Sequence, residues 1–192
     1  MKKIIKILLI ASFLLFLNSC GSDNDNIVEI DIKEYGKITI ELYPDIAPKT
    51  VKNFKELVSS KFYDGLTFHR VIYNFMIQSG DPTASGTGGS EKTIKGEFTN
   101  NGYKNTLSHT RGIISMARRG GYPDTYETMN SASSQFFIVQ NDSPHLDGNY
   151  AAFGKVISGI EIVDKIASVE TDENDKPLND IVINSIKIIK NN

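Results

Sequence analysis

Short runs in which apolar and polar residues alternate dominate most of the chain and predict β-strands. Every second side chain is apolar in residues 37–42, and residues 27–32 form a similar run just before a Tyr-Gly pair. Two such runs joined by a short turn predict a hairpin. Further β-branched or aromatic runs, bounded by Gly, Asn, Asp or Pro, lie at residues 67–72, 75–78, 113–117, 135–140, 151–156 and 181–189.

Two segments place their apolar residues at helical spacing instead. Pro48 opens the first segment, close to the first helical position that proline favours, and residues 160–167 form the second. The apolar sides are Val51, Phe54, Leu57 and Val58 in the first segment, and Ile160, Val163, Ile166 and Ala167 in the second. Many short strands, two helices and no regular strand-helix alternation predict a mainly β protein, an antiparallel barrel or sandwich.

The first twenty residues have a different pattern. Lysines precede or interrupt an apolar stretch over residues 10–17, which stops at Asn18, Ser19 and Cys20. A basic start, a short apolar core and a small residue at the break are typical of a secretory signal, whereas a spanning helix needs about 20 apolar residues. Residues 17–20 also resemble a bacterial lipobox. That resemblance implies that Cys20 is lipidated and becomes the mature N-terminus; a plain cleaved signal or an uncleaved anchor is the alternative.

The segment after Cys20 is predicted to be a flexible tether. Residues 21–26 are polar and contain no apolar side chain, so they have nothing to bury. Cys20 is the only cysteine, which rules out a disulfide within the chain. We therefore expect a signal peptide over residues 1–20, the tether, and one folded domain over residues 27–192, held outside the cytoplasm on a bacterial membrane.

Composition excludes several classes of function. The 192 residues suit a single domain, and 21 basic against 23 acidic residues give no charge signature for binding nucleic acid. Three histidines and one cysteine, with no ligand spacing among them, predict neither a metal site nor a cofactor. The glycine-rich stretch at residues 81–89 lacks the ending of a phosphate-binding loop and the third glycine of a dinucleotide fingerprint.

Residues 68–81 are the most informative segment. Strand periodicity sends Met76 and Gln78 to one face and Phe75 and Ile77 to the other, unless a break at residues 73–74 turns Phe75 round. An arginine, residue 70, also lies within this apolar stretch. Because an unpaired buried charge is costly, its side chain must reach water or find acceptors.

This segment resembles the signature of the cyclophilins, F-H-R-V-I-x-N-F-M-x-Q-x-G-D. Residues 86–89, 112–117, 134–138, and 146–148 with 153–156 follow in the order of that family, so the resemblance covers roughly residues 27–189. It implies a closed eight-stranded antiparallel β-barrel capped by two α-helices, with a peptide groove on the outer surface. It also implies a peptidyl-prolyl cis/trans isomerase that rotates X-Pro bonds and assists the folding of exported proteins, as a monomer.

The resemblance assigns Arg70 the catalytic role, as a donor aimed at the prolyl nitrogen of a twisted amide. The aromatic and aliphatic groove residues suit the proline ring, and the glutamines suit its peptide groups. The substrate-binding residues that the resemblance implies are Phe75, Met76, Gln78, Gly86, Ala117, Gln135, Phe137, Leu146, His145 and Tyr150. The implied partners are proline-containing peptides and unfolded or exported proteins.

Three positions depart from the pattern of animal cyclophilins. His145 replaces a tryptophan, Tyr150 replaces a histidine, and Arg118 replaces an asparagine. Loss of the indole implies weakened cyclosporin binding, and Arg118 is expected to add charge at the groove rim. Residues 119–130 are predicted to form a long, mobile polar loop beside the groove. A proline-peptide binding or chaperone module remains an alternative function; a hydrolase using His145 and Asp147 lacks a nucleophile.

Overall fold

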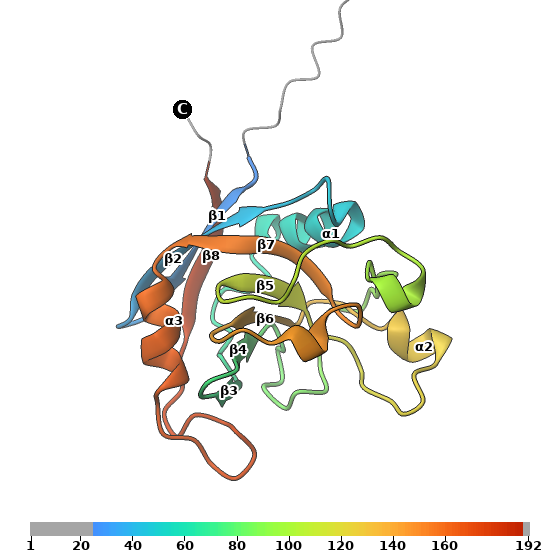
Figure 1. The fold of residues 1–192 in the computed structure, drawn as a ribbon. Helices are drawn as coiled ribbons and strands as arrows, with labels where there is room; N and C mark the ends of the chain where they lie inside the picture. Colours follow the sequence, from blue (N-terminus) through green and yellow to red (C-terminus); the bar gives the residue numbers. More distant parts are fainter. Residues whose placement is uncertain (1–24, 190–192) are drawn as a thin grey trace, which may run out of the picture.

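Eight antiparallel strands form one curled sheet, which is the main feature of the fold (Figure 1). This computed structural model describes residues 25–189; the predicted signal, Cys20 and residues 21–24 of the predicted tether lie outside the described residues. The strands are β1 (Ile27–Ile32), β2 (Gly36–Leu42), β3 (Arg70–Ile72), β4 (Met76–Ser79), β5 (Ile113–Met116), β6 (Phe136–Val139), β7 (Ala151–Ser158) and β8 (Ile183–Ile189). Across the described part of the chain, no helix is long and apolar enough to span a membrane.

The strand order is β3-β4-β6-β5-β7-β2-β1-β8, so the hydrogen-bonded ladder is open between β3 and β8. The expected closed barrel is wrong in this respect, although the eight antiparallel strands and their curled arrangement are as expected. The predicted strand over residues 67–72 is shortened to three residues in β3. The residues before it contact the segment preceding β8 through one isolated bridge, Thr67 with Val182, and through a hydrogen bond from Phe68 N–H to the Ile181 carbonyl.

The inner face of the sheet encloses the larger apolar core, and two helices cover it. Helices α1 (Pro48–Ser59) and α3 (Ile160–Ala167) lie at different ends of the curled sheet (Figure 1). Phe54 of α1 is fully buried and contacts the rings of Tyr63, Phe136 and Phe153 at centroid distances of 5.2–5.6 Å. The helices begin where the sequence predicted, but α3 buries Ile162 more fully than Ile160.

A second, smaller apolar cluster lies on the opposite, outer face of the same sheet. Strand alternation separates neighbours in sequence: Phe136 belongs to the inner core and Phe137 to the outer cluster. The buried members of the outer cluster are Met76, Ile113, Phe137, Val139, Leu146 and Ala152. A sheet buried on both faces at this point provides a rigid support for a surface site.

Three short helices lie in the connections. Residues of η1 (Thr99–Asn101) precede β5, α2 (Tyr126–Met129) lies between β5 and β6, and η2 (Pro144–Leu146) carries Leu146 onto the outer face. The sequence did not predict α2. Its start is fixed by a capping box, in which the side chains of Thr125 and Thr128 each accept a hydrogen bond from the backbone N–H of the other. The segment over residues 119–130 therefore contains regular structure.

Candidate active site

Arg70, Gln78 and Phe137 lie side by side across three strands. Arg70 on β3 is opposite Gln78 on β4, and Gln78 is opposite Phe137 on β6. Because directly opposed residues of antiparallel strands project from the same face, all three side chains lie on the outer face. Strand pairing thus brings a cation, an amide and an aromatic ring together.

The apolar side of the site is the outer cluster. Met76, Phe137 and Leu146 are buried together, and Phe75 packs against them. Phe75 shares this face because Asn74 adopts a left-handed backbone conformation, with φ of 59°, so that the turn redirects the residue before β4. His145 is exposed and lies against Phe75, with ring centroids 5.4 Å apart. We call this group of five side chains the apolar cup.

A buried polar group supports the apolar cup from below. The His109 ring stacks on Phe137 at a centroid distance of 6.0 Å, with an angle of 19° between the planes. Its Nδ1 lies 2.8 Å from Asp147 Oδ1, and its Nε2 lies 3.0 Å from Ser115 Oγ. With Nδ1 protonated, the neutral ring donates to Asp147 and accepts from the Ser115 hydroxyl. Burial lowers the pKa of His109, and the Asp147 carboxylate opposes this only in part.

Stability is expected to decrease on mild acidification. Because the folded state favours neutral His109, the folded protein binds fewer protons than the unfolded chain below the unfolded-state pKa of about 6.5. The free energy of unfolding should therefore fall as pH drops from about 6.5 towards the lower folded-state pKa. Burial also lowers the pKa of His69, so both residues contribute.

Urea unfolding at several pH values tests this expectation. His109→Gln should show a shallower loss of unfolding free energy than the wild type over the same acidic range, since one of the two buried imidazoles is gone. A variant whose pH dependence matches that of the wild type would contradict the assignment to His109.

The polar side of the site is built around two glutamines. Gln78 Nε2 donates to Gln135 Oε1 at 2.7 Å, and Gln135 Nε2 donates to the carbonyls of Gly86 and Gly88 at 3.0 and 2.8 Å. Asp81 holds this glycine-containing loop by accepting the Gly88 N–H at 3.0 Å. A side chain at position 88 would bring its Cβ within 2.1 Å of Asp81 Oδ1, so the loop requires glycine there.

A pocket of about 690 Å³ opens beside these glutamines. Its lining includes Gln78, Ala117 and Gln135, which the sequence predicted to bind substrate, and Ala117 also packs against the apolar cup. The other lining residues are Gly86, Thr87, Gly88, Gly89, Ser90, Thr93, Arg118, Arg119, Gly120, Ser131 and Ser133. The site therefore has an apolar cup next to a mostly polar pocket, which we call the side pocket.

Arg70 is exposed enough to reach a bound peptide. Its side chain is 44% exposed, and its Nε donates to Asp175 Oδ2 at 3.2 Å. Among the described residues, Nε is the only side-chain atom of Arg70 with a hydrogen-bond partner, so both terminal amino groups remain as donors. The Asp175 backbone carbonyl also accepts from Val71 N–H at 2.8 Å, which fixes this loop beside β3. Sequence reasoning missed Asp175, which is 105 positions away.

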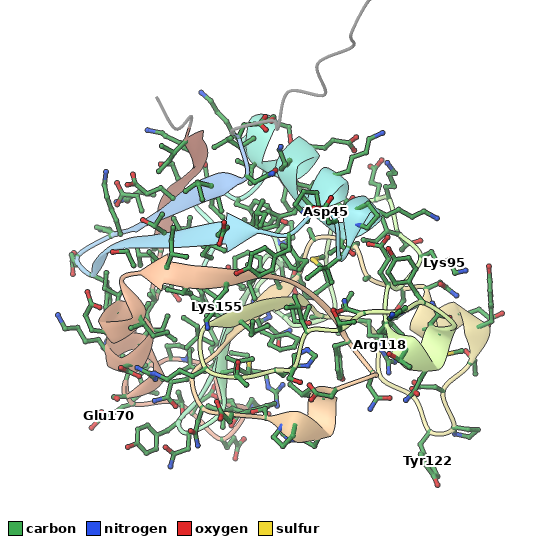
Figure 2. The ribbon with its side chains drawn as sticks, turned by 45° about the horizontal axis from the view of Figure 1, so that its top comes forward. Asp45, Lys95, Arg118, Tyr122, Lys155 and Glu170 are labelled. Carbon is green, nitrogen blue, oxygen red and sulfur yellow. The ribbon has the colours of Figure 1, made fainter. Side chains whose placement is uncertain are left out.

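Arg118 lines the side pocket, but its charge is not exposed as expected. Its side chain is only 5% exposed, so the prediction of a charge at the groove rim is wrong. The guanidinium is held by Asp124 and by the Asn149 carbonyl, and its ring neighbours include Tyr150. Figure 2 shows Arg118 between the ribbons, whereas Tyr122 projects from the neighbouring loop.

The predicted site residues gather in one region. The apolar set forms the cup, Gln78, Gln135 and Gly86 are joined by hydrogen bonds, and Tyr150 contacts Phe137 edge-on at 5.7 Å. Asp147 bonds to His109, whereas His145 lies against Phe75, so the two residues of the hydrolase alternative do not form a pair. Over residues 25–189 there is no cluster of three His, Cys, Asp or Glu side chains able to hold a metal.

The fold and the site define a mainly β protein with an apolar cluster and an adjoining, mostly polar pocket on the outer face of its sheet. A family model described as cyclophilin type peptidyl-prolyl cis-trans isomerase/CLD matches residues 27–188. The chain belongs to this family, and its domain is a cyclophilin-type peptidyl-prolyl cis-trans isomerase.

Relatives and solved structures agree with this assignment. Peptidyl-prolyl cis-trans isomerase-like 1 of Emericella nidulans is 42% identical over 156 residues, covering 81% of this chain and 90% of that protein. Peptidyl-prolyl cis-trans isomerase-like 2 of Gibberella zeae is 43% identical over 155 residues, covering 80% of this chain, which spans only 25% of that relative.

A crystal structure of a cyclophilin type peptidyl-prolyl cis-trans isomerase from Cryptosporidium parvum has a TM-score of 0.77 and 35% identity, and the match covers 87% of this chain and 99% of that one. The Cryptosporidium protein was also crystallised in the presence of the dipeptide Ala-Pro.

Proposed function

We propose that the protein accelerates rotation about X-Pro bonds by binding the proline ring in the apolar cup and directing Arg70 at the prolyl nitrogen. The observation that carries this proposal is the row of Arg70, Gln78 and Phe137 on the outer face, set by strand register. The crystallisation of the related Cryptosporidium protein in the presence of Ala-Pro supports a proline-containing peptide as the substrate class.

The chemistry needs a twisted amide rather than a nucleophile. Rotation about the peptide C–N bond has a barrier of about 18–20 kcal/mol because the bond has partial double-bond character. In the twisted state the prolyl nitrogen loses conjugation and regains a lone pair, which an arginine N–H can approach. A donor that interacts more strongly with the twisted amide than with the planar one lowers the barrier.

Arg70 supplies only part of the acceleration. Shortening an uncatalysed process of about a hundred seconds to milliseconds requires roughly five decades, or about 7 kcal/mol. One charge-assisted hydrogen bond contributes about 1.5–3 kcal/mol. The apolar cup supplies the remainder by holding the ring while the flanking chain turns, and by excluding water that stabilises the planar amide. Gln78 and Gln135 hold the peptide groups beside it.

The departure at position 145 is expected to affect drug binding. An exposed histidine in place of an indole offers less apolar surface to a cyclic peptide such as cyclosporin. We therefore propose weak cyclosporin inhibition, measurable as an inhibition constant.

The alternative of a binding or chaperone module is less favoured. Arg118, one of the two changes that suggested this alternative, does not expose its charge at the groove rim.

We further propose that the protein acts on exported proteins from a bacterial membrane, to which lipidated Cys20 attaches it. The sequence pattern of residues 1–20 motivates this, with residues 21–26 as the tether and residues 27–192 as the domain. The described chain enters the sheet at β1, away from the α2 loop beside the side pocket (Figure 1), so an anchor there would leave the groove accessible.

Cys20→Ser is expected to release the protein from the membrane fraction of the cells that produce it, because the proposed lipid is attached to the Cys20 sulfur. Fractionation followed by immunoblotting measures this, and isomerase activity of the released protein serves as the control for folding. A Cys20→Ser protein that remains in the membrane fraction in full would contradict the lipid anchor and support an uncleaved spanning segment.

A further inference from the structure

The connection from β5 to β6 forms one wall of the side pocket. Arg118, Arg119 and Gly120 line this pocket together with Gln78 and Gln135 of the groove. Residues 121–127 of the connection are exposed, and Tyr122 at the tip is fully exposed (Figure 2). A wall made from an extended surface segment keeps its shape only if something attaches it to the sheet.

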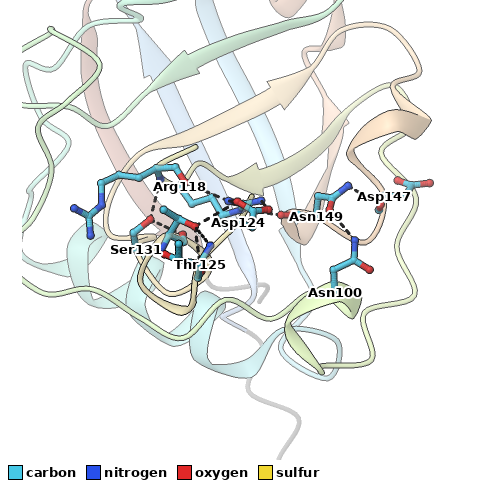
Figure 3. A network of polar contacts seen from close by, with 9 residues as sticks. Asn100, Arg118, Asp124, Thr125, Ser131, Asp147 and Asn149 are labelled. Atoms are coloured by element: carbon cyan, nitrogen blue, oxygen red, sulfur yellow. Dashed lines mark hydrogen bonds and ion pairs between the residues drawn. The ribbon is translucent and has the colours of Figure 1, made fainter. Parts of the chain in front are cut away.

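The later half of the connection is attached through Asn130, whose Oδ1 accepts from Gly96 N–H and Asn101 Nδ2, and through Asn53 Nδ2, which donates to the Ser133 carbonyl. Arg118 attaches the earlier half through its whole guanidinium group. Its two terminal nitrogens donate to the two carboxylate oxygens of Asp124, each at 2.8 Å, and its Nε donates to the Asn149 carbonyl at 3.0 Å (Figure 3). Asp124 Oδ1 also accepts from Thr128 Oγ1 at 3.3 Å, which links the pair to α2. Ser131 Oγ accepts the Arg119 N–H at 2.8 Å, which joins the two ends of residues 119–131.

The same guanidinium contacts the groove side. It lies 5.0 Å from the centroid of the Tyr150 ring and 5.3 Å from that of Phe98. Tyr150 in turn packs edge-on against Phe137 of the apolar cup. One side chain therefore connects residues 119–130, the segment before β7 and the ring that supports the proline site.

Burial distinguishes this pair from the other two arginine–carboxylate pairs among the described residues. The Arg118 side chain is 5% exposed, whereas Arg70 and Arg111 are 44% and 41% exposed in their own pairs. A buried guanidinium that loses its carboxylate leaves an unpaired charge, which costs far more than a surface pair is worth. Lysine carries its donors on one nitrogen, so it cannot reproduce the three separate donor positions that meet both oxygens of Asp124 and the Asn149 carbonyl. The Arg118 hydrogen bonds also hold the pKa of Asp124 below its ordinary value.

We propose that Arg118 is a positioning residue that, through Asp124, holds Arg119 and Gly120 of the 119–130 segment in the wall of the side pocket and so strengthens binding of the peptide residues that flank the proline. The substrate part rests on the proposed isomerase function. Arg118 acts on peptide affinity, whereas the rotation itself depends on Arg70 and the apolar cup.

Asp124→Asn is the direct test, because it keeps the size of the side chain and removes the charge and one acceptor. The matched control is Asp164→Asn, since Asp164 forms the bidentate pair with Arg111 at α3, outside the site.

Asp124→Asn should speed amide hydrogen exchange in residues 119–130 about tenfold. It should also raise KM and Kd for an Ala-Pro-containing peptide about threefold or more, with kcat within about twofold of wild type. Asp164→Asn should change none of these, and Arg118→Lys should reproduce Asp124→Asn.

Two results would overturn the proposal. One is unchanged exchange in residues 119–130, or unchanged peptide Kd, in Asp124→Asn. The other is a fall in kcat and thermal stability without a change in Kd, which is the behaviour of a purely structural residue. If the wild type shows no turnover, the isomerase proposal fails, but exchange and Kd still decide the role of Arg118.

Discussion

Arg70→Ala is expected to lower kcat/KM for an X-Pro peptide at least about tenfold, because it removes the cation that strand register places beside Gln78 and Phe137 on the outer face. The loss should appear mainly in kcat, since the donor interacts with the twisted amide more than with the planar one. A protease-coupled assay of cis-to-trans conversion measures both constants.

Two variants make that result specific to the guanidinium at position 70. Arg111→Ala removes an arginine of similar exposure that is paired with Asp164 on α3, and it should leave kcat/KM within about twofold. Asp175→Ala removes the partner of Arg70 Nε and should retain most activity, because the terminal amino groups of Arg70 are the proposed donors. Equal rates for Arg70→Ala and the wild type would refute the catalytic role.

Phe136→Ala is expected to lower the free energy of unfolding by about 3–5 kcal/mol, the range for removing a buried aromatic side chain. Phe136 is fully buried and contacts the rings of Phe54, Tyr63 and Phe68 at 5.5–6.5 Å. A total stability of about 5–15 kcal/mol is typical, so this loss removes a large fraction of it. Urea unfolding followed by circular dichroism measures the change.

Phe137→Ala is the matched comparison, because the next residue in the chain lies on the other face of the same strand. It should reduce kcat/KM more than about tenfold by opening the apolar cup and removing the ring that stacks on His109. A Phe136→Ala protein with wild-type stability would contradict the role of the inner face in stability. A Phe137→Ala protein with wild-type activity would contradict the role of the outer face in catalysis.

The fold was predictable where local pattern decides the structure. Alternation defined the β1–β2 hairpin, and helical spacing with an initial proline defined α1, because in both cases one face of the segment is buried. The open edge was not predictable in this way. Residues 67–72 are strand-like throughout, yet only Arg70–Ile72 pair with β4, since the earlier residues contact the segment before β8, more than a hundred positions later.

The candidate site was likewise predictable only in part. Family resemblance named the cup residues and the two glutamines, which the structure places close together, but it could not supply contacts made by residues outside the motifs. The pairs Arg70–Asp175, His109–Asp147 and Arg118–Asp124 depend on which loops the fold brings together. For Arg118, the sequence predicted an exposed side chain, because an arginine near a binding site usually reaches water. The side chain is buried because the connection between β5 and β6 provides Asp124 as a partner for its charge.

The most direct test of the central claim is exchange spectroscopy by NMR on an Ala-Pro-containing peptide, which reports binding and on-enzyme cis/trans interconversion in the same sample. If Arg70 stabilises the twisted amide, Arg70→Ala should bind the peptide within about threefold of the wild-type Kd while its interconversion rate falls at least about tenfold. An affinity that falls as much as the rate, or a rate that does not change, would contradict the account.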